Sequence, residues 1–263
     1  MKNLLALAED LIPAVYEAGE IELKYFNSGV EAIDKDDGSP VTLADQEAEA
    51  LILKHLARLA PEIPVVGEES VAAGSVPDIS AGTFFLVDPL DGTRDFITGS
   101  GEFTVNIGLL VDFRPVMGII YSPLKGDLYY GAEGQAFHAA KGAMAQKIST
   151  RGKPAAGLTV VTRKRNEDME QLENFLSTLH ISKIENYSSS IKFCAVAAGK
   201  ADVYPRFSPT SEWDTAAGEA ILRAAGGEVV QPDGTPMTYG KAGQKFLNGH
   251  FIARSRAIVA SDS

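Results

Sequence analysis

Two aspartates stand close together in the segment FFLVDPLDGTRDF, residues 84–96. Asp88 ends an apolar run typical of a buried strand, a proline follows it, and Asp91 comes directly before a glycine. Proline holds the preceding residue in an extended conformation, so we expect a tight turn that returns Asp91 past Asp88. Gly92 can adopt a backbone conformation that lets a ligand approach, and the N–H groups after it can bind an anion. The segment therefore has the residue types to hold a metal ion beside a phosphate.

Each acidic site also has an ordinary structural explanation. Asp, Pro and Gly are the commonest turn residues, so the first segment can be a plain turn. Glu68 and Glu69 in VVGEES can belong to a solvated loop, and Asp214 in EWDTAAGEAILRAAGG can be a helix N-cap. Together, however, the three sites offer oxygen ligands at strand ends and a helix start, which suits Mg²⁺. These motifs contain no histidine, which disfavours Zn²⁺.

Composition and charge limit the class of protein. The chain has 263 residues, of which 45% are hydrophobic and 22% charged, as is typical of a globular protein. The formal net charge of −11 disfavours binding to nucleic acid polymers, which requires a basic surface. An acidic protein with a phosphorylated substrate needs bound cations near that substrate. Cys194 is the single cysteine, so no internal disulfide can form, which is typical of a reducing compartment.

These features favour a cytoplasmic protein without a transmembrane segment, because no apolar run approaches the ~18 residues of a membrane span. Peripheral association with the inner membrane stays open. The sequence predicts two halves, residues 1–150 and 151–263, that form one compact structural unit.

In the first half, apolar spacing predicts a helix over residues 4–26, with a kink or break at Pro13. A second helix is expected from Thr42 to Ala60, where Thr42 and Asp45 have the spacing of a capping box. A short strand in residues 64–70 should run into a loop, and residues 34–40 should be a loop as well.

The strand pattern is densest over residues 83–138, with a hairpin near residues 111–115, and predicts an antiparallel or mixed sheet. The second half alternates strands with helices. One of these helices should run from Asp214 to Ala225 and end at the following glycines.

The long motifs resemble those of a known family. FLVDPLDGTRDF and WDTAAGEAILRAAGG, with GEES upstream, look like signatures of the inositol monophosphatase superfamily. Across the whole chain the resemblance is closest to the branch of CysQ-type 3'(2'),5'-bisphosphate nucleotidases, through EFTVNIGLL, SSSIKFCAVAAGKADVYPRFSPT and FLNGHF. It implies an α+β fold, a layered αβαβα sandwich. It also implies Mg²⁺-dependent, Li⁺-sensitive hydrolysis of phosphomonoesters with two or three bound ions.

The resemblance implies roles for individual residues. It assigns metal ligation to Glu68, Asp88, Leu90 (through its carbonyl), Asp91 and Asp214. It assigns phosphate binding to Asp91, Gly92 and Thr93, and catalysis through the attacking water to Glu68, Asp45 and Thr93. Glu69 is expected to support the metal ligands without binding the metal itself.

A second phosphate on the substrate would need its own donors. Ser189, Ser190, Lys192 and Arg206 are the candidates. Inositol-preferring relatives carry an acid a few positions before the Trp-Asp motif, whereas here no acid precedes Glu212 in that stretch.

We therefore expect hydrolysis of the 3'-phosphate of adenosine 3',5'-bisphosphate to AMP, and also of 3'-phosphoadenylyl sulfate, in sulfur assimilation. An inositol monophosphatase or another small sugar-phosphate phosphatase is the alternative, and a catalytically silent nucleotide-binding regulator is a third class. A homodimer is expected only by analogy with the family.

Overall fold

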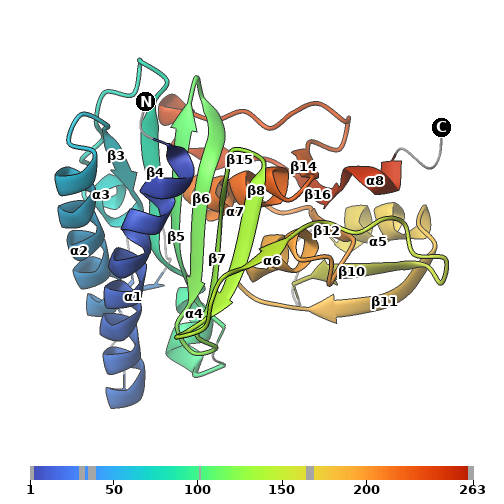
Figure 1. The fold of residues 1–263 in the computed structure, drawn as a ribbon, viewed down its shortest axis with the longest axis horizontal. Coiled ribbons are helices and arrows are strands. Elements are labelled where there is room, and N and C mark those ends of the chain that lie inside the picture. The colour runs from blue at the N-terminus through green and yellow to red at the C-terminus, as the bar shows by residue number, and fades with distance from the viewer. Residues whose placement is uncertain (1–2, 30–32, 35–39, 101, 164–168, 260–263) are drawn as a thin grey trace.

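The computed structural model describes residues 3–29, 33–34, 40–100, 102–163 and 169–259. The chain is built in five layers, in the order helices, sheet, helices, sheet, helices (Figure 1). This is the predicted α+β fold, a layered αβαβα sandwich. The described residues contain no helix that is both long and apolar enough to cross a bilayer.

The first helical layer consists of α1 (Leu4–Ser28) and α2 (Leu43–Leu59), which pack on each other and on the larger sheet. α1 continues through Pro13, so a break there is wrong, and the kink expected as the alternative stays a prediction. Leu11, Ala14 and Val15, on either side of the proline, are fully buried, and this packing stabilises the helix where a hydrogen bond is lost.

The start of α2 has the predicted capping box. The side chain of Thr42 caps the first turn, and the Thr42 N–H donates to Asp45 Oδ2 at 2.8 Å. The short strands β1 (Ile33–Asp34) and β2 (Pro40–Val41) pair just before it. Both ends of the predicted loop at residues 34–40 therefore lie in strands, and residues 35–39 lie outside the described part of the chain.

Within the residues that the structure describes, the larger sheet has seven strands in sequence order, from β3 to β9. β3 and β4 are parallel and all the other neighbours are antiparallel, which confirms the predicted mixed sheet. The predicted hairpin near residues 111–115 joins β5 to β6. The bounds are β3 (Val65–Gly67), β4 (Phe84–Asp91), β5 (Thr104–Val111), β6 (Arg114–Ser122), β7 (Asp127–Ala132), β8 (Gln135–Ala140) and β9 (Gln146–Ile148).

Two short helices follow strands of this sheet. α3 (Glu68–Ala72) follows β3 directly, so the predicted loop there is wrong. α4 (Thr93–Thr98) follows β4. Both helices begin at the acidic motifs singled out in the sequence.

The second sheet has the strand order β11-β10-β12-β16-β14. α6 and α7 lie between the two sheets, and α5 and α8 lie beyond the second sheet (Figure 1). The predicted alternation of strands and helices is present, and the helix predicted from Asp214 to Ala225 is α7, shifted by one residue. The bounds of these elements are β10 (Leu158–Thr162), α5 (Met169–Ser177), β11 (Ile181–Asn186), α6 (Ile191–Ala197), β12 (Val203–Arg206), α7 (Trp213–Ala224), β14 (Gly227–Val230), β16 (Phe251–Ser255) and α8 (Arg256–Val259). A small ladder pairs β13 (Thr210–Ser211) with β15 (Leu247–Asn248), and a short helix, η1 (Ala242–Gln244), lies before it.

Helix α7 lies directly against the backbone of the larger sheet. A Cβ added at Gly118 of β6 would lie 2.2 Å from the carbonyl oxygen of Ala217. One buried apolar cluster contains residues from both halves, among them Ile120 and Ile221. The division at residue 150 stays a prediction, although the halves share this core.

Candidate active site

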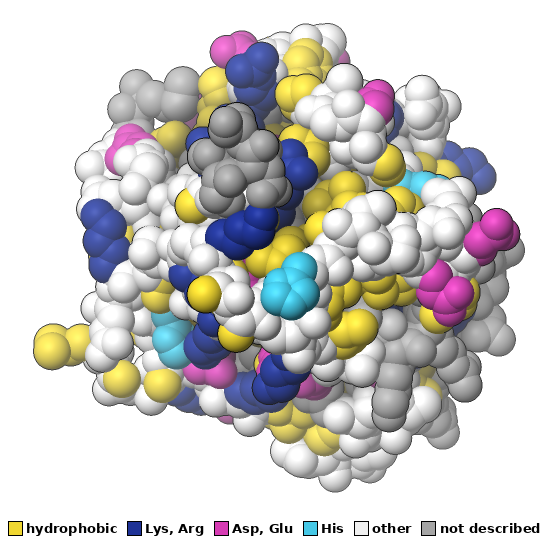
Figure 2. Space-filling view, turned by 90° about the vertical axis from the view of Figure 1, so that its right-hand side faces the viewer, with side chains coloured by type: hydrophobic (Ala, Val, Ile, Leu, Met, Phe, Trp, Pro, Cys, Tyr) yellow, Lys and Arg dark blue, Asp and Glu magenta, His cyan; other side chains and the backbone are white. Residues whose placement is uncertain are grey.

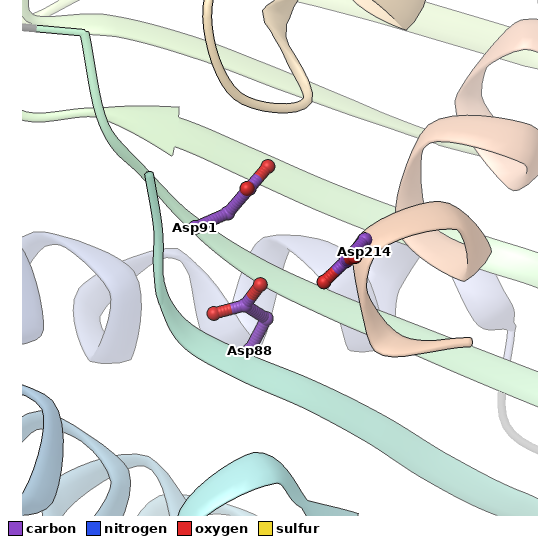
Figure 3. Close-up of side chains that lie close together, drawn as sticks. All are labelled: Asp88, Asp91 and Asp214. Carbon is purple, nitrogen blue, oxygen red and sulfur yellow. The ribbon is translucent and has the colours of Figure 1, made fainter. Parts of the chain in front are cut away.

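Three aspartates converge where the larger sheet meets α7. Asp88 and Asp91 come from the end of β4, and Asp214 comes from the first turn of α7. One carboxylate oxygen of each lies within 4.8 Å of the others. Figure 3 shows the three side chains pointing toward one another from the strand and the helix. Segments 123 residues apart in the chain, at Asp91 and Asp214, thus form one acidic cluster.

A bulge in β4 separates its two aspartates. Asp88 pairs with Asn106 and Asp91 pairs with Thr104, so β4 has one more residue than β5 between these pairs. The Leu90 N–H donates to Asp88 Oδ1 at 3.0 Å, which fixes that carboxylate across the turn. The bulge lets two residues on one strand both turn their carboxylates toward the same point.

Gly92 makes the close turn after Asp91. Its φ is 105°, and a Cβ there would lie 2.8 Å from the carbonyl oxygen of Glu102. Helix α4 starts at the next residue, Thr93, whose hydroxyl lies 3.2 Å from the Leu90 oxygen and 3.4 Å from Asp45 Oδ1. The structure thus places Thr93 and Asp45 together, the pair that the resemblance assigns to the attacking water, and that role stays a prediction.

Two carboxylates of the cluster, Asp88 and Asp91, have a raised pKa. Burial, followed by the charges of Glu68, Asp91 and Asp214, raises the pKa of Asp88 well above its ordinary value. Burial and Asp214 also raise the pKa of Asp91, against the opposing effects of Ser190, Lys192 and Arg206. Buried oxygen donors that repel one another in this way fit a divalent cation, which would relieve the repulsion.

Asp214 is the second residue of α7 and not its N-cap, a position that Glu212 occupies. The N-cap explanation of Asp214 is therefore wrong. Its Oδ2 accepts from the Ser211 N–H at 3.0 Å and from the hydroxyl of Thr210. These bonds hold the carboxylate toward Asp88.

Glu68 lines the same pocket as the three aspartates. It is the first residue of α3, and this helix is anchored by Glu49 of α2, a side chain only 3% exposed. Glu49 accepts from the N–H groups of Glu69 and Ser70, each at 2.8 Å. Glu69 is not among the residues that line the pocket, and its supporting role stays a prediction.

The acidic cluster opens into a pocket of about 230 Å³. The pocket is lined by every predicted metal and phosphate residue, and by all four predicted substrate residues: Glu68, Asp88, Leu90, Asp91, Gly92, Thr93, Asp214, Ser189, Ser190, Lys192 and Arg206. Arg94 and Arg163 also line it, and the sequence analysis missed both. Figure 2 shows Lys and Arg side chains around a hollow with a hydrophobic floor on the face formed by the second half of the chain.

Lys192 is almost fully buried, at 1% exposure. Burial lowers its pKa to about 7, with Arg206 and Arg163 acting in the same direction and Asp91 against them. Its Nζ donates to the carbonyl oxygens of Tyr187 and Ser189, at 3.2 and 2.5 Å. A bound anion would favour the charged form of this lysine.

The adjacent serines at the pocket differ in their hydrogen bonds. Ser190 Oγ donates to Asp91 Oδ2 at 2.6 Å and accepts from Asn106 Nδ2 at 3.0 Å. Ser189 has a positive φ of 51°, and its buried Oγ has no hydrogen-bond partner among the described residues. Sequence reasoning missed Asn106, although a polar residue in the apolar strand TVNIGLLV was a signal.

Comparison with known proteins gives a consistent result. A model of the inositol monophosphatase family matches residues 4–260. A 3'(2'),5'-bisphosphate nucleotidase CysQ of Salmonella typhimurium is 40% identical over 247 residues, which cover 93% of this chain and 98% of the relative. The crystal structure of CysQ from Bacteroides thetaiotaomicron, a bacterial member of that family, superposes with a TM-score of 0.78 at 36% identity, covering 95% of this chain and 97% of the other. An inositol monophosphatase from Anabaena, at 24% identity and a TM-score of 0.73 over 99% of this chain and 94% of its own, shares the fold.

Proposed function

Because this chain belongs to the inositol monophosphatase family, we propose that it is a metal-dependent phosphatase of the 3'(2'),5'-bisphosphate nucleotidase type. Its substrate is adenosine 3',5'-bisphosphate, from which it removes the 3'-phosphate to leave AMP. We extend the proposal to 3'-phosphoadenylyl sulfate, to a place in sulfur assimilation, and to a cytoplasmic location. A homodimer remains an expectation from the family.

A pocket lined by both acidic and basic side chains is the main support. Asp88, Asp91 and Asp214 line it together with Lys192, Arg206 and Arg163. A substrate with one phosphate at the aspartates and a second anionic group near the basic side chains fits this lining. A polyol phosphate without a second anionic group would leave the basic side chains without a substrate partner, so the lining favours a bisphosphate over the inositol phosphate alternative.

The residues present fit Mg²⁺ as the resident ion. Its ligands would be the carboxylates of Glu68, Asp88, Asp91 and Asp214 and the Leu90 carbonyl, all hard oxygen donors. When bound, two or three such ions supply positive charge that lowers the pKa of water and stabilises a leaving oxygen. Li⁺ is expected to inhibit.

The chain's own groups would position the reactants. The backbone N–H groups at Gly92 and Thr93 are available to bind the phosphate that is cleaved. The Thr93 hydroxyl, with Asp45 and Glu68, would orient the attacking water. Lys192 and Arg206, with the unpartnered hydroxyl of Ser189, would bind the second phosphate.

The test is a measurement of inorganic phosphate released from adenosine 3',5'-bisphosphate and from inositol 1-phosphate, with Mg²⁺, with EDTA and with added Li⁺. Release from the nucleotide that requires Mg²⁺ and falls with Li⁺ is the expected result. Preference for inositol 1-phosphate would support the inositol monophosphatase alternative. Only the metal-site part of this proposal would then be retained. No release from either substrate would support the silent regulator.

A further inference from the structure

Two uncharged residues, Asn106 and Ser190, form a hydrogen-bonded chain that ends at the carboxylate of Asp91. Asn106, on β5, is fully buried and donates from Nδ2 to Ser190 Oγ at 3.0 Å. Ser190, at the start of α6, is 3% exposed and donates to Asp91 Oδ2 at 2.6 Å. The same Oγ lies 2.9 Å from the carbonyl oxygen of Asp214. Three separate segments of the chain therefore meet at one serine hydroxyl.

We propose that Ser190 and Asn106 are positioning residues that hold Asp91 in the orientation needed for metal binding, and that Ser190 does not bind the substrate. The inference revises the expected role of Ser190 and rests on the proposed function of the site as a metal-dependent phosphatase.

The number of hydroxyl protons supports this assignment. Serine has one O–H donor, and a carboxylate at 2.6 Å is a stronger acceptor than the amide carbonyl at 2.9 Å. Because Asn106 donates to Ser190, the serine's own proton is directed to Asp91. Ser190 then has no proton left for a substrate phosphate, which accepts hydrogen bonds but cannot donate them when ionised.

The neighbouring serine has the complementary arrangement. Ser189 Oγ is buried, lacks a hydrogen-bond partner among the described residues, and belongs to a residue that lines the pocket. Its backbone is held at a φ of 51°, a conformation that non-glycine residues seldom adopt. Ser189 is therefore the hydroxyl donor that remains for the substrate, whereas Ser190 orients Asp91.

Terbium luminescence provides a test that does not depend on turnover. Trp213 is the only tryptophan and immediately precedes Asp214, so it can sensitise Tb³⁺ bound at the acidic cluster. The full chain would be titrated with Tb³⁺, and the bound ion then displaced with Mg²⁺. Ser190→Ala should weaken both affinities by about 10–100-fold, the usual effect of removing a group that orients a metal ligand.

Ser189→Ala is the matched control. It should leave the Tb³⁺ and Mg²⁺ affinities unchanged and raise KM for adenosine 3',5'-bisphosphate. Ser190→Ala, at saturating Mg²⁺, should keep KM close to that of the wild type. If Ser190→Ala instead keeps its metal affinity and raises KM, the inference is overturned.

A second variant separates orientation from a general loss of structure. Ser190→Thr keeps the hydroxyl and should restore the metal affinity that Ser190→Ala loses. If Ser190→Thr binds metal as weakly as Ser190→Ala while its thermal unfolding matches the wild type, the hydroxyl is not responsible and the inference fails. Since Tb³⁺ titration needs no substrate, absence of nucleotidase activity would overturn the proposed function without deciding this one.

Discussion

The carboxylate of Glu49 fills the space in which any residue larger than glycine at position 67 would place its Cβ. A Cβ on Gly67 would lie 2.5 Å from Glu49 Cδ and 2.6 Å from each of its oxygens. Because that carboxylate also accepts two N–H groups of α3, the contact sets the position of the helix that begins with Glu68.

Gly67→Ala should therefore displace Glu49 and disturb Glu68. We expect a loss of about 1–3 kcal/mol of unfolding free energy, the usual effect of leaving buried hydrogen-bonding groups unpaired. The Mg²⁺ concentration for half-maximal activity should rise as well. Denaturant unfolding and Mg²⁺ titration would measure both effects. Gly152→Ala is the control, because nothing lies within 4 Å of a Cβ added there; equal behaviour of the two variants would contradict the prediction.

Asp91→Asn should lower kcat by at least about 100-fold, because the site loses a charged ligand that also belongs to the phosphate-binding turn. Phosphate release at several Mg²⁺ concentrations would measure the loss. Asp112→Asn, at an exposed turn, should behave as the wild type. Near-normal turnover of Asp91→Asn would remove Asp91 from the catalytic site.

Arg163→Ala should raise KM for adenosine 3',5'-bisphosphate by about 10-fold or more, since a hydrogen bond to a charged group contributes roughly 1.5–3 kcal/mol. The KM for adenosine 3'-monophosphate should change less, because that substrate lacks the second phosphate. The KM for both substrates would be measured for Arg163→Ala. The control is Arg114→Ala, because Arg114 lies outside this pocket. An equal effect on both substrates would show that Arg163 does not recognise the second phosphate.

Lys192 should make substrate affinity depend on pH. Its pKa, lowered to about 7, means that the free protein loses this charge as the pH rises through neutrality. The phosphate binds the charged form, so KM should rise from pH 6 to pH 8. Lys192→Met should have a raised KM that lacks this rise. If the ratio of the two KM values stays constant with pH, titration of Lys192 is not the cause.

Glu22, in α1, should make stability depend on pH. It is fully buried, and both carboxylate oxygens lack a partner among the described residues. Burial, and secondarily Asp45, raises its pKa well above the ordinary value. A raised pKa in the folded state means that stability is greatest below the unfolded-state pKa and is lost as the pH rises toward the folded-state pKa.

Relative to Glu22→Gln, the wild type should therefore lose up to ~1.4 kcal/mol of unfolding free energy per pH unit above about pH 4.3. Urea unfolding in EDTA from pH 4 to pH 8 would test this. The Glu20→Gln variant, at an exposed residue of the same helix, is the control for removing an acidic side chain. A difference between wild type and Glu22→Gln that stays constant with pH would contradict the prediction.

The sequence is most informative where the chemistry is local. The bulged turn from Asp88 to Gly92 and the capping box at Thr42 follow from adjacent residues with strong backbone preferences. The motif around Asp214 indicates a further oxygen ligand, and the resemblance assigns it to the same metal site as the turn, 123 residues away along the chain.

The supporting residues could not be predicted in the same way. Asn106 reaches its partner Ser190 across 84 positions, and Glu49 contacts an α3 that the sequence pattern suggests is a loop. Pro13 fails as a helix breaker because burial of its neighbours outweighs its local preference. Each of these outcomes depends on tertiary packing, which residue type and spacing do not encode directly.

The contribution of Asp214 from the second half of the chain links ion binding to maturation of the protein. While the chain emerges from the ribosome, the first half presents Asp88 and Asp91 without their third partner. With the proposed ligands, the metal site would be complete only after α7 has docked on the sheet, so closely that Gly118 leaves no room for a side chain. Ions that bind only this docked state also stabilise it by mass action. An incomplete or proteolysed chain that lacks α7 should therefore be unable to hydrolyse a nucleotide. Metal binding would then indicate that the protein is fully folded.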